Sequence, residues 1–214
     1  MSVAVKICGL STPAAVAAAI AGGARYVGFV FYPPSPRAVS AAAAARLAAA
    51  VPEGTSRVGV FVDAEDAAIA AVLDRLPLDL LQFHGRESPQ RVAAARRRFG
   101  RPIIKALAVA GPQDLAAAAR YEEAADLLLF DAKPPPLPQA LPGGNGLAFE
   151  WRLLAGRHWR RPWMLSGGLR AETLAEAVRM SGARIVDVSS GVERRPGDKD
   201  PDKIRAFLAA AHAL

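Results

Sequence analysis

Short runs rich in β-branched and other apolar residues alternate with alanine-rich stretches along the whole chain. Eight runs are predicted to be strands, at Val3–Ile7, Tyr26–Phe31, Arg57–Val62, Leu78–Phe83, Pro102–Leu107, Leu127–Phe130, Pro162–Leu165 and Arg184–Val188. Between them, apolar positions recur with the period of a helix that buries one face. Helices are predicted at Thr12–Ala21, Ala41–Ala50, Glu65–Leu76, Pro89–Phe99 and from Pro201 to about Ala211. This alternation is typical of an α/β protein with a parallel sheet.

The expected helix boundaries carry residues that start and stop helices. Thr12 precedes Pro13 and Ser88 precedes Pro89, so a hydroxyl cap is followed by a proline in the first turn. Glycines stand where helices are expected to end, at Gly22-Gly23, Gly100 and Gly182.

The number and rhythm of the units predict how the sheet is arranged. Eight β/α units in 214 residues give about 27 residues each, which suits a single (β/α)8 TIM barrel of the α/β class covering residues 1–214 as one domain. A doubly wound open sheet is the alternative. It is disfavoured because the rhythm is unbroken and because no Gly-x-Gly-x-x-Gly motif follows the first strand.

One segment interrupts the rhythm after the sixth predicted strand. Residues 132–148 form a Pro/Gly-rich loop that contains Lys133-Pro134-Pro135-Pro136 and Gly143-Gly144-Asn145-Gly146. In a barrel this loop emerges at the face where the chemistry takes place, so we expect a lid over the site. A tolerated surface insertion is the alternative.

Composition limits the cellular setting. With 52% hydrophobic and 22% charged residues the chain can build a large core. No apolar run approaches the roughly 18 residues of a membrane span, and the start of the chain turns polar too soon for a secretory signal. Cys8 is the single cysteine, which excludes an internal disulfide and fits a reducing compartment. A cytoplasmic protein without a membrane partner is expected.

The net charge of +7 has three interpretations: a nucleic-acid partner, an anionic substrate or a bias of composition. The arginines occur in short runs interrupted by alanine, a pattern more typical of solvated helix faces than of a binding stripe. We therefore expect no nucleic-acid partner, and an acidic small substrate remains compatible with the charge.

Alternate residues of a strand face opposite sides of the sheet, and in a barrel one side is the interior. We expect the polar member of each strand to be the interior one, because the other face must pack against helices. These residues are Lys6 and Cys8, Gln82 and His84, Lys105, Asp131, and Asp187 and Ser189. Lys6 and Asp187, on adjacent strands one and eight, are expected to pair, which makes Lys6 mainly structural.

Two glycine- and serine-rich turns follow the seventh and eighth predicted strands. They are Ser166-Gly167-Gly168-Leu169 and Ser189-Ser190-Gly191-Val192-Glu193. Glycines let backbone N–H groups approach an anion, hydroxyls add donors, and these two strand ends are the recurrent phosphate position of the barrel. Gly167, Gly168, Ser189, Ser190 and Gly191 are therefore predicted to bind a phosphate, with plain turn chemistry as the alternative.

Several motifs are found in one order from residue 3 to the final helix. They are Lys6-Ile7-Cys8-Gly9, Gly28-Phe29-Val30-Phe31, Ser35-Pro36-Arg37, Leu81-Gln82-Phe83-His84-Gly85, Phe130-Asp131, Gly143-Gly144-Asn145-Gly146, Phe149-Glu150-Trp151, Ser166-Gly167-Gly168-Leu169 and Asp187-Val188-Ser189-Ser190-Gly191-Val192-Glu193. Together they resemble the phosphoribosylanthranilate isomerases of tryptophan biosynthesis. Three positions depart from the family pattern, namely Ala132, Asn145 and Glu150, whereas Cys8 and Asp131 match it.

The resemblance implies an Amadori rearrangement of a phosphorylated aminoaldose, N-(5-phosphoribosyl)anthranilate, without metal or cofactor. Carried over by motif, Cys8 is the general base, Asp131 is the general acid and Arg37 meets the anthranilate carboxylate. His84 and Asp187 are expected to bind substrate, although His84 fits an internal hydrogen bond equally well. Strands six, seven, eight and one are consecutive, so the acid and the base would flank the phosphate turns.

Other functions stay open at this point. Another phosphosugar isomerase or epimerase would need metal ligands or paired acids, and a Schiff-base aldolase would need an isolated lysine, for which Lys105 is the only loose candidate. A non-catalytic protein that binds a phosphometabolite or nucleic acid, suggested only by the basic charge, is a further alternative. The expected assembly is a monomer or a homodimer.

Overall fold

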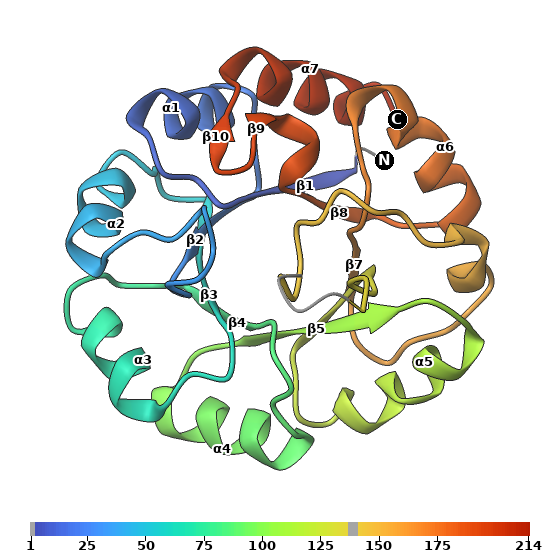
Figure 1. The fold of residues 1–214 in the computed structure, drawn as a ribbon, viewed down its shortest axis with the longest axis horizontal. Helices are drawn as coiled ribbons and strands as arrows, with labels where there is room; N and C mark the ends of the chain where they lie inside the picture. Colours follow the sequence, from blue (N-terminus) through green and yellow to red (C-terminus); the bar gives the residue numbers. More distant parts are fainter. Residues whose placement is uncertain (1–2, 137–140) are drawn as a thin grey trace.

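The computed structural model of the chain describes residues 3–136 and 141–214. Its eight parallel strands form a closed barrel in sequence order, with β8 beside β1 (Figure 1). The strands are β1 (Ala4–Cys8), β2 (Tyr26–Val30), β3 (Ser56–Phe61), β4 (Leu80–Phe83), β5 (Ile103–Val109), β6 (Leu127–Ala132), β7 (Trp163–Leu165) and β8 (Ile185–Val188). The predicted TIM barrel is therefore confirmed.

Helices surround the barrel as an outer ring (Figure 1). They are α1 (Pro13–Ala21), α2 (Ala41–Ala48), α3 (Asp66–Leu73), α4 (Pro89–Phe99), α5 (Pro112–Ala116), α6 (Ala171–Ser181) and α7 (Pro201–His212), with 3-10 helices η1 (Ala118–Tyr121), η2 (Trp151–Leu154) and η3 (Ser190–Val192). Within the described residues β6 is followed by η2 and no α-helix, so the expectation of eight full β/α units is wrong at the sixth. The triple proline at 134–136 removes backbone donors that a helix there would need.

The predicted helix caps are confirmed. The hydroxyl of Thr12 accepts a hydrogen bond from the N–H of Ala15, and the hydroxyl of Ser88 accepts one from Arg91. At the other end, α4 and α6 stop at Gly100 and Gly182, which both adopt the left-handed conformation with φ of 59° and 76°. These local signals fix where each helix returns the chain to the next strand.

The interior of the barrel is filled by apolar side chains below its carboxyl end. One buried cluster contains Val58, Leu80, Ile104, Ala106, Leu129 and Met164. A second, larger cluster fills the space between the strands and the helices. Because the lower interior is packed, polar chemistry is confined to the mouth at the carboxyl ends of the strands.

The expectation that Lys105 faces the interior is wrong. Its neighbours Ile104 and Ala106 belong to the interior cluster, so Lys105 points to the outer side of β5. There its ammonium group lies 2.7 Å from the carboxylate of Glu87 and donates to the carbonyl of Gly85 at 2.7 Å. A carboxylate and a carbonyl outside the barrel satisfy this charge, which the apolar interior layer could not do.

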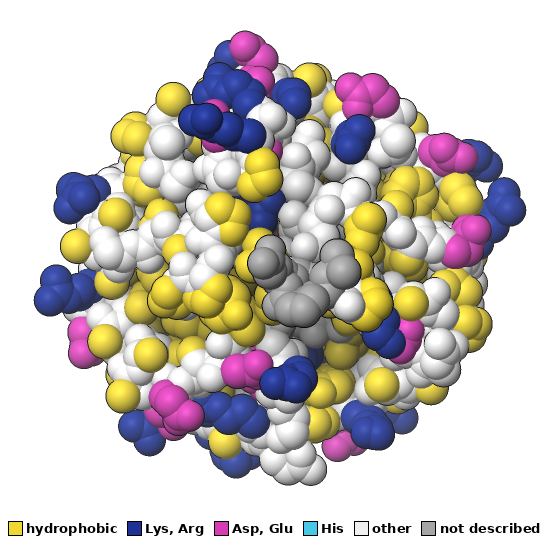
Figure 2. Space-filling view, viewed as in Figure 1, with side chains coloured by type: hydrophobic (Ala, Val, Ile, Leu, Met, Phe, Trp, Pro, Cys, Tyr) yellow, Lys and Arg dark blue, Asp and Glu magenta, His cyan; other side chains and the backbone are white. Residues whose placement is uncertain are grey.

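The Pro/Gly-rich loop predicted at 132–148 begins one residue later than expected, since Ala132 is the last residue of β6. Residues 137–140 lie outside the described residues, and the segment from Pro142 to Leu147 lines the mouth of the barrel. The same face is shown in Figure 2, where Lys and Arg side chains are spread around the rim among Asp and Glu and form no single stripe.

Two antiparallel strands form a hairpin between β8 and α7. They are β9 (Glu193–Arg195) and β10 (Asp198–Lys199), and sequence patterning did not reveal them. The hairpin lies beside the mouth and places two buried charged side chains next to it, as described below. Among the residues described, no helix is long and apolar enough to cross a membrane.

Candidate active site

One cleft at the carboxyl ends of the strands brings together all the residues predicted for the site. The predicted residues that line it are Cys8, Arg37, His84, Asp131, Gly167, Gly168, Asp187, Ser189, Ser190 and Gly191. Strand alternation explains much of the grouping, because Cys8, Asp131 and Asp187 are the last inward-facing positions of their strands. Arg37 instead comes from the loop after β2.

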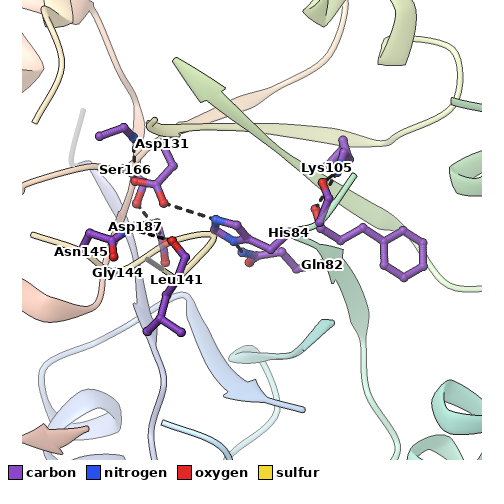
Figure 3. Close-up of polar contacts among 12 residues, drawn as sticks. Gln82, His84, Lys105, Asp131, Leu141, Gly144, Asn145, Ser166 and Asp187 are labelled. Atoms are coloured by element: carbon purple, nitrogen blue, oxygen red, sulfur yellow. Dashed lines mark hydrogen bonds and ion pairs between the residues drawn. The ribbon is translucent and has the colours of Figure 1, made fainter. Parts of the chain in front are cut away.

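Cys8 ends β1 above a buried ion pair. The ammonium group of Lys6 lies 2.9 Å from Oδ1 of Asp187, which confirms the expected pairing. Asp187 also accepts a hydrogen bond of 3.3 Å from the hydroxyl of Ser166 (Figure 3). Burial raises the pKa of the Cys8 thiol, the charge of Lys6 opposes that rise, and the net direction is upward. Lys6 is therefore more than structural, because it is the nearest counter-charge for a thiolate.

Asp131 is held by a short chain of polar side chains that crosses the cleft from β4 (Figure 3). Its Oδ2 lies 3.3 Å from Nε2 of His84, and Nδ1 of His84 lies 2.9 Å from the amide nitrogen of Gln82. Its Oδ1 accepts a hydrogen bond from the backbone N–H of Ala132. His84 thus makes the internal hydrogen bonds that were one of its two predicted roles, and it does so at the wall of the cleft.

The guanidinium group of Arg37 lies on the β2 side of the cleft and is hydrogen-bonded to a carboxylate. Nε and Nη2 donate to the two oxygens of Glu193 at 2.8 and 2.9 Å. Glu193 in turn lies 2.6 Å from the ammonium group of Lys199. Sequence reasoning assigned no role to Glu193 and Lys199. Glu193 is the last residue of the motif that begins at Asp187, so its place in the motif could have marked it as a candidate. Lys199 lies in no motif, and no signal in the sequence marked it.

The two predicted phosphate turns lie side by side at the ends of β7 and β8. Gly167 and Gly168 both have positive φ, 87° and 68°, and lead into the first turn of α6 at Ala171. A helix N-terminus with glycine-rich backbone before it favours an anion. The hydroxyl of Ser189 donates to the carbonyl of Cys8 at 3.2 Å, so this side chain also ties β8 to β1.

The described part of the loop after β6 reaches over the cleft. The carbonyl of Gly144 accepts a hydrogen bond of 3.0 Å from Nη2 of Arg37. A Cβ atom on Gly143 would stand 2.4 Å from Nε2 of His84 and 2.8 Å from Oδ2 of Asp131, so the backbone passes close above both groups. The loop therefore bonds Arg37 on one side and passes close to His84 and Asp131 on the other, which is the placement expected of a lid.

The fold and the cleft together define a class, the TIM-barrel enzymes with a polar cleft at the carboxyl ends of the strands. Comparison with known proteins gives the family within that class. The profile of the family described as N-(5'phosphoribosyl)anthranilate (PRA) isomerase matches residues 5–210. The N-(5'-phosphoribosyl)anthranilate isomerase of Rhodospirillum centenum is 61% identical over 214 residues, all of both chains.

Solved structures agree. Monomers generated from the dimeric enzyme of Thermotoga maritima align with a TM-score of 0.85 at 36% identity, covering 99% of this chain and 100% of that one. A phosphoribosyl anthranilate isomerase in complex with reduced 1-(o-carboxyphenylamino)-1-deoxyribulose 5-phosphate aligns with a TM-score of 0.83 at 34% identity, with the same coverage. The chain belongs to the N-(5'-phosphoribosyl)anthranilate isomerase family, whose enzymes act in tryptophan biosynthesis.

Proposed function

We propose that the chain performs the family's Amadori rearrangement with Cys8 as the general base and Asp131 as the general acid. One observation carries this assignment: the two side chains line the same cleft from β1 and β6, on either side of the turns that follow β7 and β8. A phosphate held by those turns leaves the ribose between the thiol and the carboxyl group. A base and an acid on opposite sides of one carbon framework are what the reaction needs.

The steps balance with these two groups and solvent, because after each turnover water returns a proton to Asp131 and removes one from Cys8. The carboxyl group of Asp131 gives its proton to the ribose ring oxygen, the bond from that oxygen to C1′ breaks, and the nitrogen lone pair forms an iminium. The thiolate of Cys8 then takes the proton from C2′, and the C2′–H electron pair flows toward the iminium to give an enolamine. The enolamine tautomerises to the ketone, 1-(2-carboxyphenylamino)-1-deoxyribulose 5-phosphate. The iminium accepts the electrons itself, so the chain needs no cofactor for this step.

The electrostatics of the thiol set a limit on this chemistry. Because burial raises the pKa of Cys8, only a small fraction is thiolate near neutrality. The ammonium group of Lys6 is the counter-charge that makes this fraction usable, and Asp187 keeps Lys6 in place. A cysteine base is effective even at a low thiolate fraction, because the thiolate is intrinsically reactive.

The remaining predicted residues would bind the two anionic ends of the substrate, its phosphate and its carboxylate. Gly167, Gly168, Ser190 and Gly191 would hold the phosphate, and Ser189 would do so through its backbone because its hydroxyl is engaged. Arg37 would meet the anthranilate carboxylate through Nη1, since Nε and Nη2 already bind Glu193. We also propose one cytoplasmic domain, active as a monomer or homodimer, without a nucleic-acid partner.

The test follows the loss of fluorescence of freshly made phosphoribosylanthranilate, without added metal. We expect turnover in the wild type, and a fall in kcat of about 10²–10⁴-fold in both Cys8→Ala and Asp131→Asn. Asp126→Asn is the matched control, because Asp126 precedes the same strand at the opposite end of the barrel and bonds the N–H of Ile103. Normal turnover in Cys8→Ala would remove the assigned base. Salt-dependent DNA binding without turnover would favour the binding-protein alternative.

A further inference from the structure

Three buried charges lie beside the β2 edge of the cleft and form a cluster. The side chains of Arg37, Glu193 and Lys199 are 5%, 4% and 0% exposed. Glu193 comes from β9 and Lys199 from β10, so the hairpin after β8 delivers both of them to the arginine. Burying three charges is unfavourable unless each one is paired, and here each one is.

The contacts fix the orientation of the arginine. The Nε–Nη2 edge of Arg37 fits both oxygens of Glu193, which is the bidentate geometry that holds a guanidinium in one plane. The second hydrogen of Nη2 goes to the carbonyl of Gly144. Within residues 3–136 and 141–214 no hydrogen bond uses Nη1. This nitrogen is the donor that Arg37 keeps for a ligand in the cleft.

The cluster also sets the charge that a ligand meets. Burial by itself raises the pKa of Glu193, but the hydrogen bonds of Arg37 and the charge of Lys199 bring it below its usual range, so Glu193 is ionised. A lone Glu193 would cancel the charge of Arg37. Burial lowers the pKa of Lys199, and the charge of Glu193 opposes that fall. In its protonated form Lys199 adds a second cation behind Glu193, so the three groups together then carry one positive charge.

Lys199 further connects the cluster to the rest of the site. Its ammonium group donates to the carbonyl and the hydroxyl of Ser189 at 2.9 and 3.1 Å. The hydroxyl of Ser189 donates to the carbonyl of Cys8. The cluster is therefore anchored to the strand that carries the thiol, and the arginine is held at a fixed place relative to the reacting end of the cleft.

We propose that Glu193 and Lys199 are a positioning pair that sets selectivity for a carboxylated aromatic amine. Glu193 fixes the plane of the Arg37 guanidinium so that Nη1 faces the ligand, and Lys199 preserves the positive charge that attracts the carboxylate. This proposal rests on the proposed function, in which Arg37 meets the anthranilate carboxylate. Neither residue of the pair touches the substrate in this account.

The experiment compares two stable ligands by calorimetry on the full chain. One is reduced 1-(o-carboxyphenylamino)-1-deoxyribulose 5-phosphate, and the other has a plain phenylamino group instead. The ratio of the two Kd values measures selectivity for the carboxylate. In Glu193→Gln we expect the ratio to fall about tenfold, because one amide cannot accept both hydrogen bonds of the arginine. Binding of the plain ligand is expected to change little.

Asp198→Asn is the matched control, because Asp198 is a carboxylate of the same hairpin that pairs with the exposed Arg194. It should leave the ratio unchanged. Lys199→Gln should lower the ratio as well, since the Arg37–Glu193 pair is then neutral. If Glu193→Gln does not fold, Glu193→Asp takes its place. It keeps the charge but is one methylene shorter, so the ratio of the two Kd values should fall in part.

The outcomes separate two kinds of failure. If the wild type binds neither ligand and does not turn over phosphoribosylanthranilate, the proposed function fails. If the wild type prefers the carboxylated ligand and a folded Glu193 variant keeps the full ratio, the positioning role fails alone. Equal weakening of both ligands would mean a general loosening of the cleft, and it would also overturn the proposal.

Discussion

Among the buried lysine–carboxylate pairs of the described residues, two lie on opposite sides of the barrel sheet. Inside the barrel, Lys6 lies 2.9 Å from Asp187, and outside it Lys105 lies 2.7 Å from Glu87. All four side chains are nearly inaccessible to solvent. The chemistry of the two pairs is alike, but the groups around them differ.

The outer pair is surrounded by backbone. Lys105 donates to the carbonyl groups of Phe83 and Gly85, and Glu87 accepts hydrogen bonds from the N–H groups of Asp63 and Gly85. It therefore ties the turns after β3 and β4 to β5. The inner pair instead has a thiol beside it, at the wall of the cleft. The pair outside the sheet thus holds loops together, whereas the pair inside it lies beside the thiol of Cys8 and affects the pKa of that thiol.

The strongest test of this comparison replaces each lysine with methionine. Each change leaves a buried carboxylate unpaired and should destabilise the fold by about 3–5 kcal/mol. Only Lys6→Met should also lower the kcat of the folded enzyme by about 10²-fold or more, because the thiolate loses its counter-charge. In Lys105→Met the fall in kcat should stay within about tenfold, the effect of a slightly displaced turn. Urea unfolding and kcat per folded molecule give the two quantities.

Equal losses of kcat in the two variants would remove the distinction between the pairs. Arg96→Met serves as the control for loss of a charge from an exposed ion pair, because Arg96 bonds Asp126 at the far end of β6 and is 41% exposed. Its effect on both quantities should be small.

The pH dependence sharpens the comparison further. In the proposed mechanism the base is the thiolate, and burial holds the pKa of Cys8 above its ordinary value, so kcat/KM should keep rising on the alkaline side of neutrality. Lys6 lowers the thiol pKa by its charge, so Lys6→Met should move this rise to still higher pH. Lys105→Met should leave it in place. A pH profile with the same alkaline limb in both variants would contradict the role given to Lys6.

The same pKa has a consequence for stability. Because the folded pKa of Cys8 is raised, the folded state holds the thiol proton more tightly than the unfolded chain does. This contribution is present below the unfolded thiol pKa and is lost as the pH rises through the folded one. Urea unfolding at increasing alkaline pH should therefore show a larger loss of stability in the wild type than in Cys8→Ala.

A smaller effect is expected from Gly28→Ala, which probes the space around the inner pair. A Cβ atom there would stand 3.2 Å from both the sulfur of Cys8 and the ammonium nitrogen of Lys6. The two groups must then separate slightly, and kcat should fall about tenfold while the fold is kept. Gly85→Ala is its counterpart at the outer pair, where the new atom meets Asp63. It should lower stability and leave kcat near the wild-type value, as thermal unfolding and fluorescence turnover would show.

The smallest effect is expected from Tyr121→Phe. The hydroxyl of Tyr121 donates to the carbonyl of Glu87 at 3.1 Å, outside the barrel. Its loss should lower the free energy of unfolding by about 1 kcal/mol without a change in kcat or in the pH profile. A measurable fall in kcat would show that the outer pair reaches the chemistry after all.

Much of the fold and part of the site could be predicted because they depend on local rules. The alternation of strand faces, together with the neighbouring places of strands one and eight, was enough to pair Lys6 with Asp187. The same rule failed at Lys105, because polarity was taken to decide which face is inward. In the structure the apolar layer of Ile104 and Ala106 decides it, and the partner Glu87 comes from a loop.

Contacts between distant segments were beyond such rules. Glu193 and Arg37 are 156 residues apart, and their meeting depends on a hairpin too short to show in the hydrophobic pattern. The expectation of a helix in the sixth unit failed for a related reason. The count of eight units implied a helix there, although three prolines follow one another in this segment. In the hairpin and in the sixth unit, the regular β/α repeat was assumed to continue through a segment that does not follow it.

The position of β8 beside β1 has a consequence for how the protein is made. Lys6 and Asp187 are separated by 181 residues, so a growing chain exposes its thiol and its lysine long before their carboxylate partner is synthesised. Long-range pairings of this kind form late, because loop closure must precede them. The last barrel strand to leave the ribosome thus closes the ring and supplies the carboxylate partner of Lys6 in one event.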